Sequence, residues 1–320
     1  RQRELPLLPP DHPALMRFKA KRCAVLKEVQ AWVAEEVARK NVDAPFMVLD
    51  QRTFRALLGA LLAFAIVVFA GPRIIAWLRK KKIGDTGLTD AESLQNAANS
   101  KKNTPTMGGI LVCGAIVVAT ALLANITNMY VILGLVVVIW LAMLGGVDDW
   151  LKLTAASRPG GFRQGLRAWE KLLFQLGLGA LVGYFVFKHG DSSAAEDLGH
   201  VLNLPFQRTW EWVEASGSWR TNPALIYLPA SIFVVLAVLV IAGMSNAVNI
   251  ADGMDGLAAG TTTIVALGMI VLTAIAGDDN MAKYLLVPSI TQSDELLVMV
   301  ATVAGACLGF LWWNCQPAKV

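Results

Sequence analysis

The stretch MGGILVCGAIVVATALLANITNMYVILGLVVVIWLAMLGGVDDWLK, residues 107–152, decides the fold of this chain. It carries no charged side chain from residue 107 to residue 147, and it then presents two adjacent carboxylates, Asp148 and Asp149. Such a run is too long for one transmembrane helix, which needs about 20 apolar residues. The polar segment 125–128 divides it, so the sequence predicts two membrane-spanning helices joined by a short turn.

Further runs without a charged side chain occur on both sides of this stretch. They are residues 56–72, 172–187, 224–251, 256–277 and 296–318. Together with the two spans above, they predict an all-α fold, a polytopic integral membrane bundle with about seven spans.

The composition of the 320 residues fits a membrane protein and excludes a disordered chain. Hydrophobic residues make up 55% and charged residues 16%, against about 25% charged residues in a typical soluble domain. The formal net charge of +4 does not favour a nucleic-acid partner. The four cysteines and three histidines lack the spacing of metal ligands, so we expect neither a disulfide framework nor a structural zinc site.

The loops suggest an orientation and a division of the chain. Residues 1–53 form a polar extension with an amphipathic helix, lying on the membrane surface or in solvent, and residues 54–320 form the membrane domain. Loops 73–106 and 148–171 are rich in Lys and Arg and are predicted to be cytoplasmic, whereas loop 188–223 is predicted to lie outside.

The carboxylate pair at the end of an apolar span is the first candidate for chemistry. Asp148 and Asp149 are followed by Lys152 within one helical turn. Ionisable groups at membrane depth are expensive to keep there, so they are candidates for function. Carboxylate oxygens suit Mg²⁺ bound together with a phosphate. The alternative is that the pair only marks a helix end in water.

A second candidate is a polar stripe within NAVNIADGMDG, residues 246–256. Amides and carboxylates at this spacing suit recognition of a base or a ribose, or support of a metal. Gly253 and Gly256 allow a helix break there. The alternative is hydrogen bonding between helices inside the bilayer. The stripe consists of Asn246, Asn249, Asp252 and Asp255.

Two further motifs flank spans. In KKNTPTMGG, residues 101–109, Lys101 and Thr104 are candidates for holding diphosphate oxygens, and the alternative is helix capping and anchoring at the membrane edge. In GFLWWNCQPA, residues 309–318, interfacial anchoring explains the two tryptophans but does not explain Asn314.

Taken together, the chain resembles the phospho-N-acetylmuramoyl-pentapeptide-transferase family, within the polyprenyl-phosphate N-acetylhexosamine-1-phosphate transferase superfamily. The resemblance runs from about residue 53 to residue 320. It is carried by TFRALLGALLAFAIVVFAGPRIIAWLR, KKNTPTMGGI, GGVDDWLK, NAVNIADGMDGLA and GACLGFLWWNCQPAKV. The segments TPTMGG and GFLWWNCQPA point to the muramoyl-pentapeptide branch.

The resemblance implies a reaction. Such an enzyme transfers phospho-MurNAc-pentapeptide from UDP-MurNAc-pentapeptide to undecaprenyl phosphate, with Mg²⁺, and yields lipid I and UMP for peptidoglycan biosynthesis. It implies a multi-pass protein of the bacterial cytoplasmic membrane whose active site faces the cytoplasm. Its partners are these two substrates and membrane lipid, and a homodimer stays open.

The resemblance also implies roles for individual residues. The implied catalytic residues are Asp148, Asp149, Asp252 and Asp255, with Asp149, or alternatively Asp148, as metal ligand. The implied substrate-binding residues are Lys101, Thr104, Lys152, Asn246, Asn249 and Asn314.

Two departures from the family pattern and two alternatives remain. The family continues past the position of Val320 with a metal-holding Asp, so we expect a C-terminally incomplete chain that is inactive by itself. Trp169 stands where the family usually has a basic residue. One alternative is a UDP-GlcNAc:polyprenyl-phosphate GlcNAc-1-phosphate transferase, against which TPTMGG argues. The other is a transporter or scaffold, against which the position of the carboxylate pair at the membrane edge argues.

Overall fold

The computed structural model describes residues 49–80, 108–155, 165–189, 198–214, 216–251, 255–290 and 292–315. Residues 52–320 form one compact unit, and the description below concerns that unit. The predicted N-terminal amphipathic helix lies outside the described residues, as do the site candidates Lys101, Thr104 and Asp252.

Six helices in the described part of the chain are long and apolar enough to cross a membrane. A further apolar helix, α4 (Gly109–Leu123), has 15 residues and is about 22 Å long, which is shorter than the roughly 30 Å apolar core of a bilayer. The predicted spans are therefore present as six long helices and one short one. The long helices are α2 (Arg52–Lys80), α5 (Met129–Ala155), α6 (Ala168–His189), α7 (Ala230–Ala251), α8 (Leu257–Ala276) and α10 (Leu296–Asn314).

Two short antiparallel ladders between α6 and α7 were not predicted from the sequence. Strand β1 (Val201–Leu202) pairs with β4 (Ile226–Tyr227), and β2 (Trp210–Val213) pairs with β3 (Ser218–Thr221). The buried Trp210 ties this segment to the chain after helix α9 (Asp279–Tyr284), because its indole N–H donates to the Val287 carbonyl at 2.9 Å.

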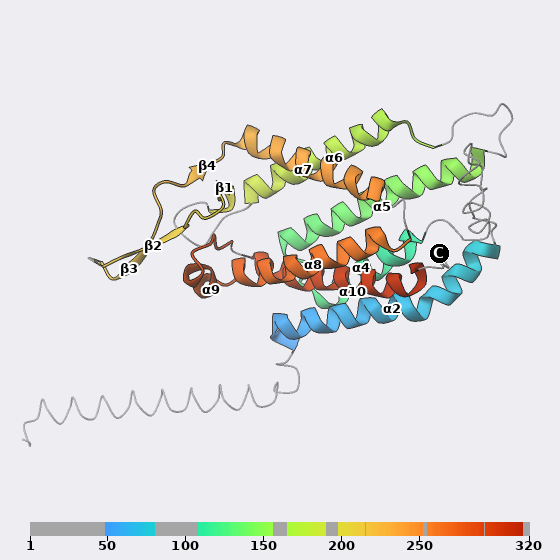
Figure 1. Cartoon of the computed structure of the whole chain (residues 1–320), viewed down its shortest axis with the longest axis horizontal. Coiled ribbons are helices and arrows are strands. Elements are labelled where there is room, and N and C mark those ends of the chain that lie inside the picture. The colour runs from blue at the N-terminus through green and yellow to red at the C-terminus, as the bar shows by residue number, and fades with distance from the viewer. Residues whose placement is uncertain are drawn as a thin grey trace, which may run out of the picture. The chain divides into compact units, whose positions relative to one another are not determined.

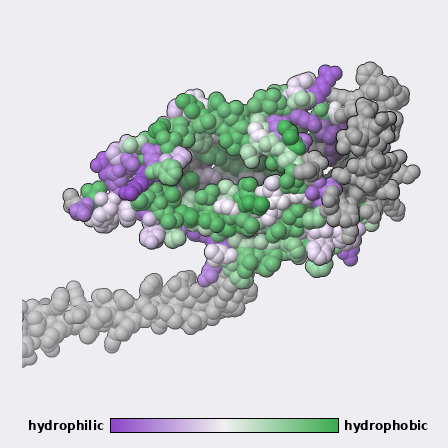
Figure 2. All heavy atoms as spheres, in the orientation of Figure 1, coloured by the Kyte–Doolittle hydropathy of each residue, from purple (hydrophilic) through white to green (hydrophobic). Residues whose placement is uncertain are grey.

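The helices alternate in direction, so their ends form two sets (Figure 1). The β end of the bundle holds the four strands and α9. The opposite end, which we call the site end, holds the last residues of α5, α7 and α10 and the first residues of α6 and α8. Hydrophobic residues cover much of the helical face that Figure 2 shows, and hydrophilic ones gather toward the two ends.

Helix α10 is the most buried of the six long helices and packs closely against α2. Gly305 makes this approach possible, because a Cβ atom there would lie 2.0 Å from the Ala60 carbonyl oxygen. A buried hydrogen bond of 2.9 Å joins the hydroxyls of Thr120 on α4 and Thr302 on α10. Helix α10 is thus the centre around which α2 and α4 are arranged.

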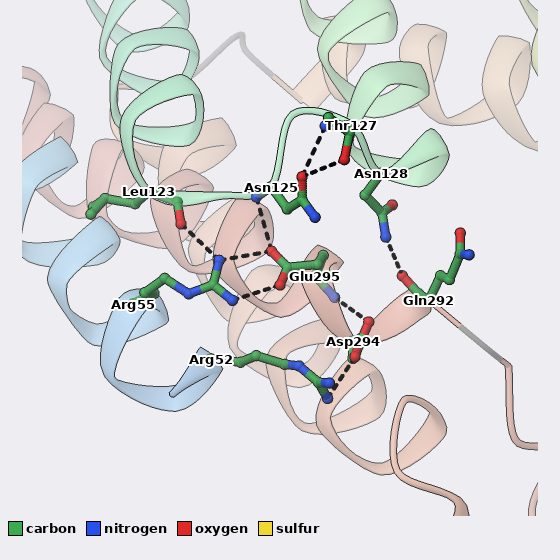
Figure 3. Close-up of polar contacts among 9 residues, drawn as sticks. All are labelled: Arg52, Arg55, Leu123, Asn125, Thr127, Asn128, Gln292, Asp294 and Glu295. Atoms are coloured by element: carbon green, nitrogen blue, oxygen red, sulfur yellow. Dashed lines mark hydrogen bonds and ion pairs between the residues drawn. The ribbon is translucent and has the colours of Figure 1, made fainter. Parts of the chain in front are cut away.

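A polar clamp closes the β end (Figure 3). Arg55 of α2 donates to both carboxylate oxygens of Glu295, at 3.0 and 2.6 Å, and to the Leu123 carbonyl at 3.0 Å. The Asn125 backbone N–H donates to Glu295 at 3.0 Å. The clamp therefore joins α2, the α4–α5 turn and the start of α10.

The turn predicted at residues 125–128 is confirmed, and its side chains explain it. The Asn128 side-chain oxygen accepts from the backbone N–H groups of Tyr130 and Val131, at 2.9 and 3.2 Å, and so caps α5. Its amide nitrogen donates to the Gln292 carbonyl at 2.9 Å, across to the segment before α10 (Figure 3).

Candidate active site

Asp148 lies at the site end of α5 and is 6% exposed. Its Oδ1 accepts a hydrogen bond from the Leu166 backbone N–H at 2.8 Å. Its Oδ2 lies 2.7 Å from Lys171 Nζ and 2.8 Å from Lys152 Nζ. Asp148 thus anchors the chain that leads into α6 and pairs with two ammonium groups at once.

At Gly165 the backbone passes directly over the Asp148 carboxylate. Its φ of +105° lies in a region that side chains rarely adopt, and a Cβ atom there would lie 2.8 Å from Asp148 Oδ1. The same Cβ would lie 3.2 Å from Lys152 Cγ. Glycine therefore lets the chain pass directly over Asp148 and donate the next N–H group to it.

Asp149 is in a different environment from its neighbour. Its side chain is 37% exposed, and Lys152 Nζ lies 3.6 Å from its Oδ1. Consecutive helical residues point about 100° apart, so the two carboxylates share Lys152, whereas of the two only Asp148 contacts Lys171 and the Leu166 N–H. Asp149 is the more exposed of the two carboxylates.

An apolar groove with a cavity of about 360 Å³ lies between α5 and α6. It adjoins the acid pair, which is our name for Asp148 and Asp149, because Leu166, which lines the groove, also donates its N–H to Asp148. The lining residues are Trp140, Met143, Leu144, Val147, Leu166 and Phe174. A charged cluster therefore stands at the edge of a predominantly apolar cavity.

Helix α6 connects this cluster to the polar stripe on α7. One turn after Lys171, the buried Gln175 donates from Nε2 to Ser245 Oγ at 3.0 Å and accepts from Asn246 Nδ2 at 2.7 Å. Sequence reasoning missed Gln175, although a lone amide within an apolar run was a signal. Asn246 therefore does make the hydrogen bond between helices that was considered as an alternative.

Of the remaining residues of the stripe, Asn249 and Asp255 lie on either side of a helix break, as predicted. Helix α7 ends at Ala251 with Asn249 exposed on its last turn, and α8 begins at Leu257 after Gly256, whose φ is +77°. A Cβ atom at Gly256 would lie 3.5 Å from the Asn314 carbonyl oxygen. The segment that carries Asp255 is thus next to the end of α10.

No group of three or more His, Cys, Asp or Glu side chains suited to a metal ion occurs among the described residues. The structure gathers the ends that carry Asp148, Asp149, Lys152, Asn246, Asn249, Asp255 and Asn314 at the site end, and it adds Lys171 and Gln175. Direct contacts within this set join Asp148 to the two lysines, Asp149 to Lys152, and Gln175 to Asn246.

Comparisons with known proteins match most of the chain. Residues 131–320 match the family model described as Glycosyl transferase family 4, and residues 101–113 match the one described as Phospho-N-acetylmuramoyl-pentapeptide-transferase signature 1. A protein of Desulfotalea psychrophila named Phospho-N-acetylmuramoyl-pentapeptide-transferase is 34% identical over 277 residues, which are 87% of this chain and 69% of the relative. A protein of the same name in Salinibacter ruber is 36% identical over 283 residues, 86% of this chain and 69% of the relative.

Proposed function

The chain belongs to the phospho-N-acetylmuramoyl-pentapeptide-transferase family of multi-pass membrane enzymes in peptidoglycan synthesis, and on this premise we propose how its site end works. The donor is UDP-MurNAc-pentapeptide, the acceptor is undecaprenyl phosphate, and the products are lipid I and UMP. The site end faces the cytoplasm, since a charged nucleotide does not cross a bilayer unaided.

One observation carries the proposal: two carboxylates and two lysines stand at the edge of an apolar groove. An acceptor with a phosphate head and an isoprenoid tail needs such a combination, because the head must be held by cations while the tail stays out of water. The groove volume of about 360 Å³ is at the small end for ligand pockets, so it suits the part of the tail next to the phosphate.

Asp149 fits Mg²⁺ on its donor chemistry. The ion is usually bound by one or two carboxylates together with substrate phosphates, and Asp149 offers a partly exposed carboxylate at the site end. When bound, Mg²⁺ neutralises charge that develops on the phosphate oxygens during transfer. A dedicated cage of several protein carboxylates is not required for that role.

Asp148 holds the two lysines for the phosphates. A carboxylate has about four acceptor sites, and Asp148 uses three of them on Leu166 N–H, Lys152 and Lys171. The fourth is left to accept a proton or a hydrogen bond from the acceptor phosphate. Each ammonium group has three N–H donors, so both lysines keep donors for phosphate oxygens while paired with Asp148.

The donor nucleotide and sugar are assigned to the other helix ends. Asn246, Asn249, Asp255 and Asn314 provide amide and carboxylate groups there, and Lys101, Thr104 and Asp252 join them by the sequence pattern. This arrangement places the acceptor between α5 and α6 and the nucleotide toward α7, α8 and α10.

The test is Mg²⁺-dependent UMP release by the full-length protein in detergent, with both substrates present. Asp149→Asn should lower turnover about 100-fold or more, because the charge that binds the metal is lost. Glu214→Gln, which removes an exposed carboxylate at the β end, is the matched control and should leave turnover unchanged. Release of UMP from UDP-GlcNAc but not from UDP-MurNAc-pentapeptide would replace this function with the GlcNAc-1-phosphate alternative.

A further inference from the structure

We propose that Gln175 is a positioning residue that fixes the side-chain amide of Asn246, so that Asn246 presents its oxygen to a hydrogen-bond donor of the nucleoside. The inference rests on the function proposed above, because it assumes a uridine nucleotide at the site end. It concerns a residue that touches no reacting atom and acts through Asn246.

Both N–H donors of the Asn246 amide are already used. Nδ2 donates to the Ala242 carbonyl at 2.8 Å and to Gln175 Oε1 at 2.7 Å. An amide nitrogen has two hydrogens, and a backbone carbonyl can only accept, so the nitrogen must face α6 and its own helix. Among the described residues, none donates to Asn246 Oδ1. The oxygen is therefore the group left for a ligand.

Gln175 is itself held in one orientation. Its Nε2 donates to Ser245 Oγ at 3.0 Å and its Oε1 accepts from Asn246 Nδ2, so both ends of its amide are engaged. The side chain is 4% exposed, so water does not replace these partners. A buried amide that loses its partner is costly, and this keeps the network in one arrangement.

Close packing of α6 on α7 maintains the register of this network. A Cβ atom at Gly179 would lie 2.7 Å from Val238 Cα, and one at Gly183 would lie 2.8 Å from Ala237 Cβ. The two backbones approach because both α6 positions lack a side chain. Lys171, four residues before Gln175 and on the same face of α6, is bonded to Asp148 at 2.7 Å. One helix thus sets the acid pair and the Asn246 amide relative to each other.

The free group determines what Asn246 can recognise. An amide oxygen accepts from N–H or O–H groups and is repelled by phosphate oxygens, so within the nucleotide the partner of Asn246 is a donor of the nucleoside and not a phosphate oxygen. In a uridine nucleotide such donors are the ribose hydroxyls and the imide N3–H. The group that Asn246 binds is a single hydrogen-bond donor, either a ribose hydroxyl or the N3–H. Analogues that each lack one of these donors identify which of them it is.

The experiment measures how tightly the full-length protein binds UMP, 2′-deoxy-UMP, 3′-deoxy-UMP and N3-methyl-UMP, by calorimetry in detergent. The unmodified protein should bind one of these analogues about 10-fold more weakly than UMP, the value of one hydrogen bond. In Gln175→Met that penalty should fall below about 2-fold, because the oxygen is no longer held in place. Gln207→Met, at the β end, is the control and should keep the full penalty.

Asn246→Ala provides a second measurement if Gln175→Met does not fold, and it should abolish the same penalty. The inference is overturned if no analogue binds more weakly than UMP to the unmodified protein. It is equally overturned if the penalty survives in Gln175→Met or in Asn246→Ala. Failure of the unmodified protein to release UMP from UDP-MurNAc-pentapeptide would instead overturn the proposed function, so the two failures are distinguishable.

Discussion

The polar clamp at the β end holds α2 to the start of α10 through Arg55 and Glu295 (Figure 3). The change Glu295→Gln should therefore lower the stability of the bundle. The side chains of Arg55 and Glu295 are 17% and 10% exposed, so water compensates little for a lost partner. Removing one member of a buried ion pair costs about 3–5 kcal/mol, because the other charge is left buried and alone. Glutamine keeps one acceptor for Arg55, so we expect a loss near about 3 kcal/mol in the free energy of unfolding.

A neighbouring pair between the same two segments is the matched control. Arg52 bonds to Asp294, but its side chain is 51% exposed, and Arg52→Gln should cost about 1 kcal/mol or less. The single change Arg55→Met should resemble Glu295→Gln. The two changes combined should cost clearly less than their sum, because neither charge is then left unpaired.

The measurement is reversible unfolding in mixed micelles with increasing dodecyl sulfate, followed by tryptophan fluorescence. The clamp lies at the end opposite the acid pair, so UMP release per folded molecule should not change in any of these variants. The reasoning is refuted if Glu295→Gln costs no more than Arg52→Gln, or if the combined variant loses the full sum of the single losses.

Three further predictions concern the site end. Gly165→Ala should lower UMP release at least about 10-fold, because a Cβ atom there displaces Asp148. Gly114→Ala, in open space on α4, should leave UMP release unchanged, and equal rates for the two variants would contradict the packing argument. Leu144→Trp fills the apolar groove and should raise the KM for the polyprenyl acceptor but not for the nucleotide donor; a donor effect of the same size would exclude the groove as the tail site. A cysteine replacing Trp169 should be labelled only from the cytoplasm and one replacing Arg220 only from outside, and reversed labelling would invert the proposed orientation.

Several features of the fold could be predicted because they depend on nearby residues. The apolar runs predict helices, and the breaks between α4 and α5 and between α7 and α8 follow from Asn and Gly residues in the segments themselves. The helix ends were less predictable. Helix α2 continues past Pro72 and Arg73 to Lys80, because charge ends an apolar run but does not end backbone hydrogen bonding. The β ladders escaped prediction because two-residue strands such as β1 and β4 leave almost no periodic pattern.

The sequence by itself indicated which side chains are candidates for the chemistry and predicted that they stand at helix ends, because burying a charge in a bilayer is costly. Only the tertiary structure decided that Asp148 is enclosed by two lysines and a backbone N–H while Asp149 stays partly exposed. It also decided that Gln175 accepts a hydrogen bond from Asn246. The physical reason is that a hydrogen bond needs its partners within about 3 Å, and such distances between helices depend on how closely their backbones pack, as at Gly165 and Gly179.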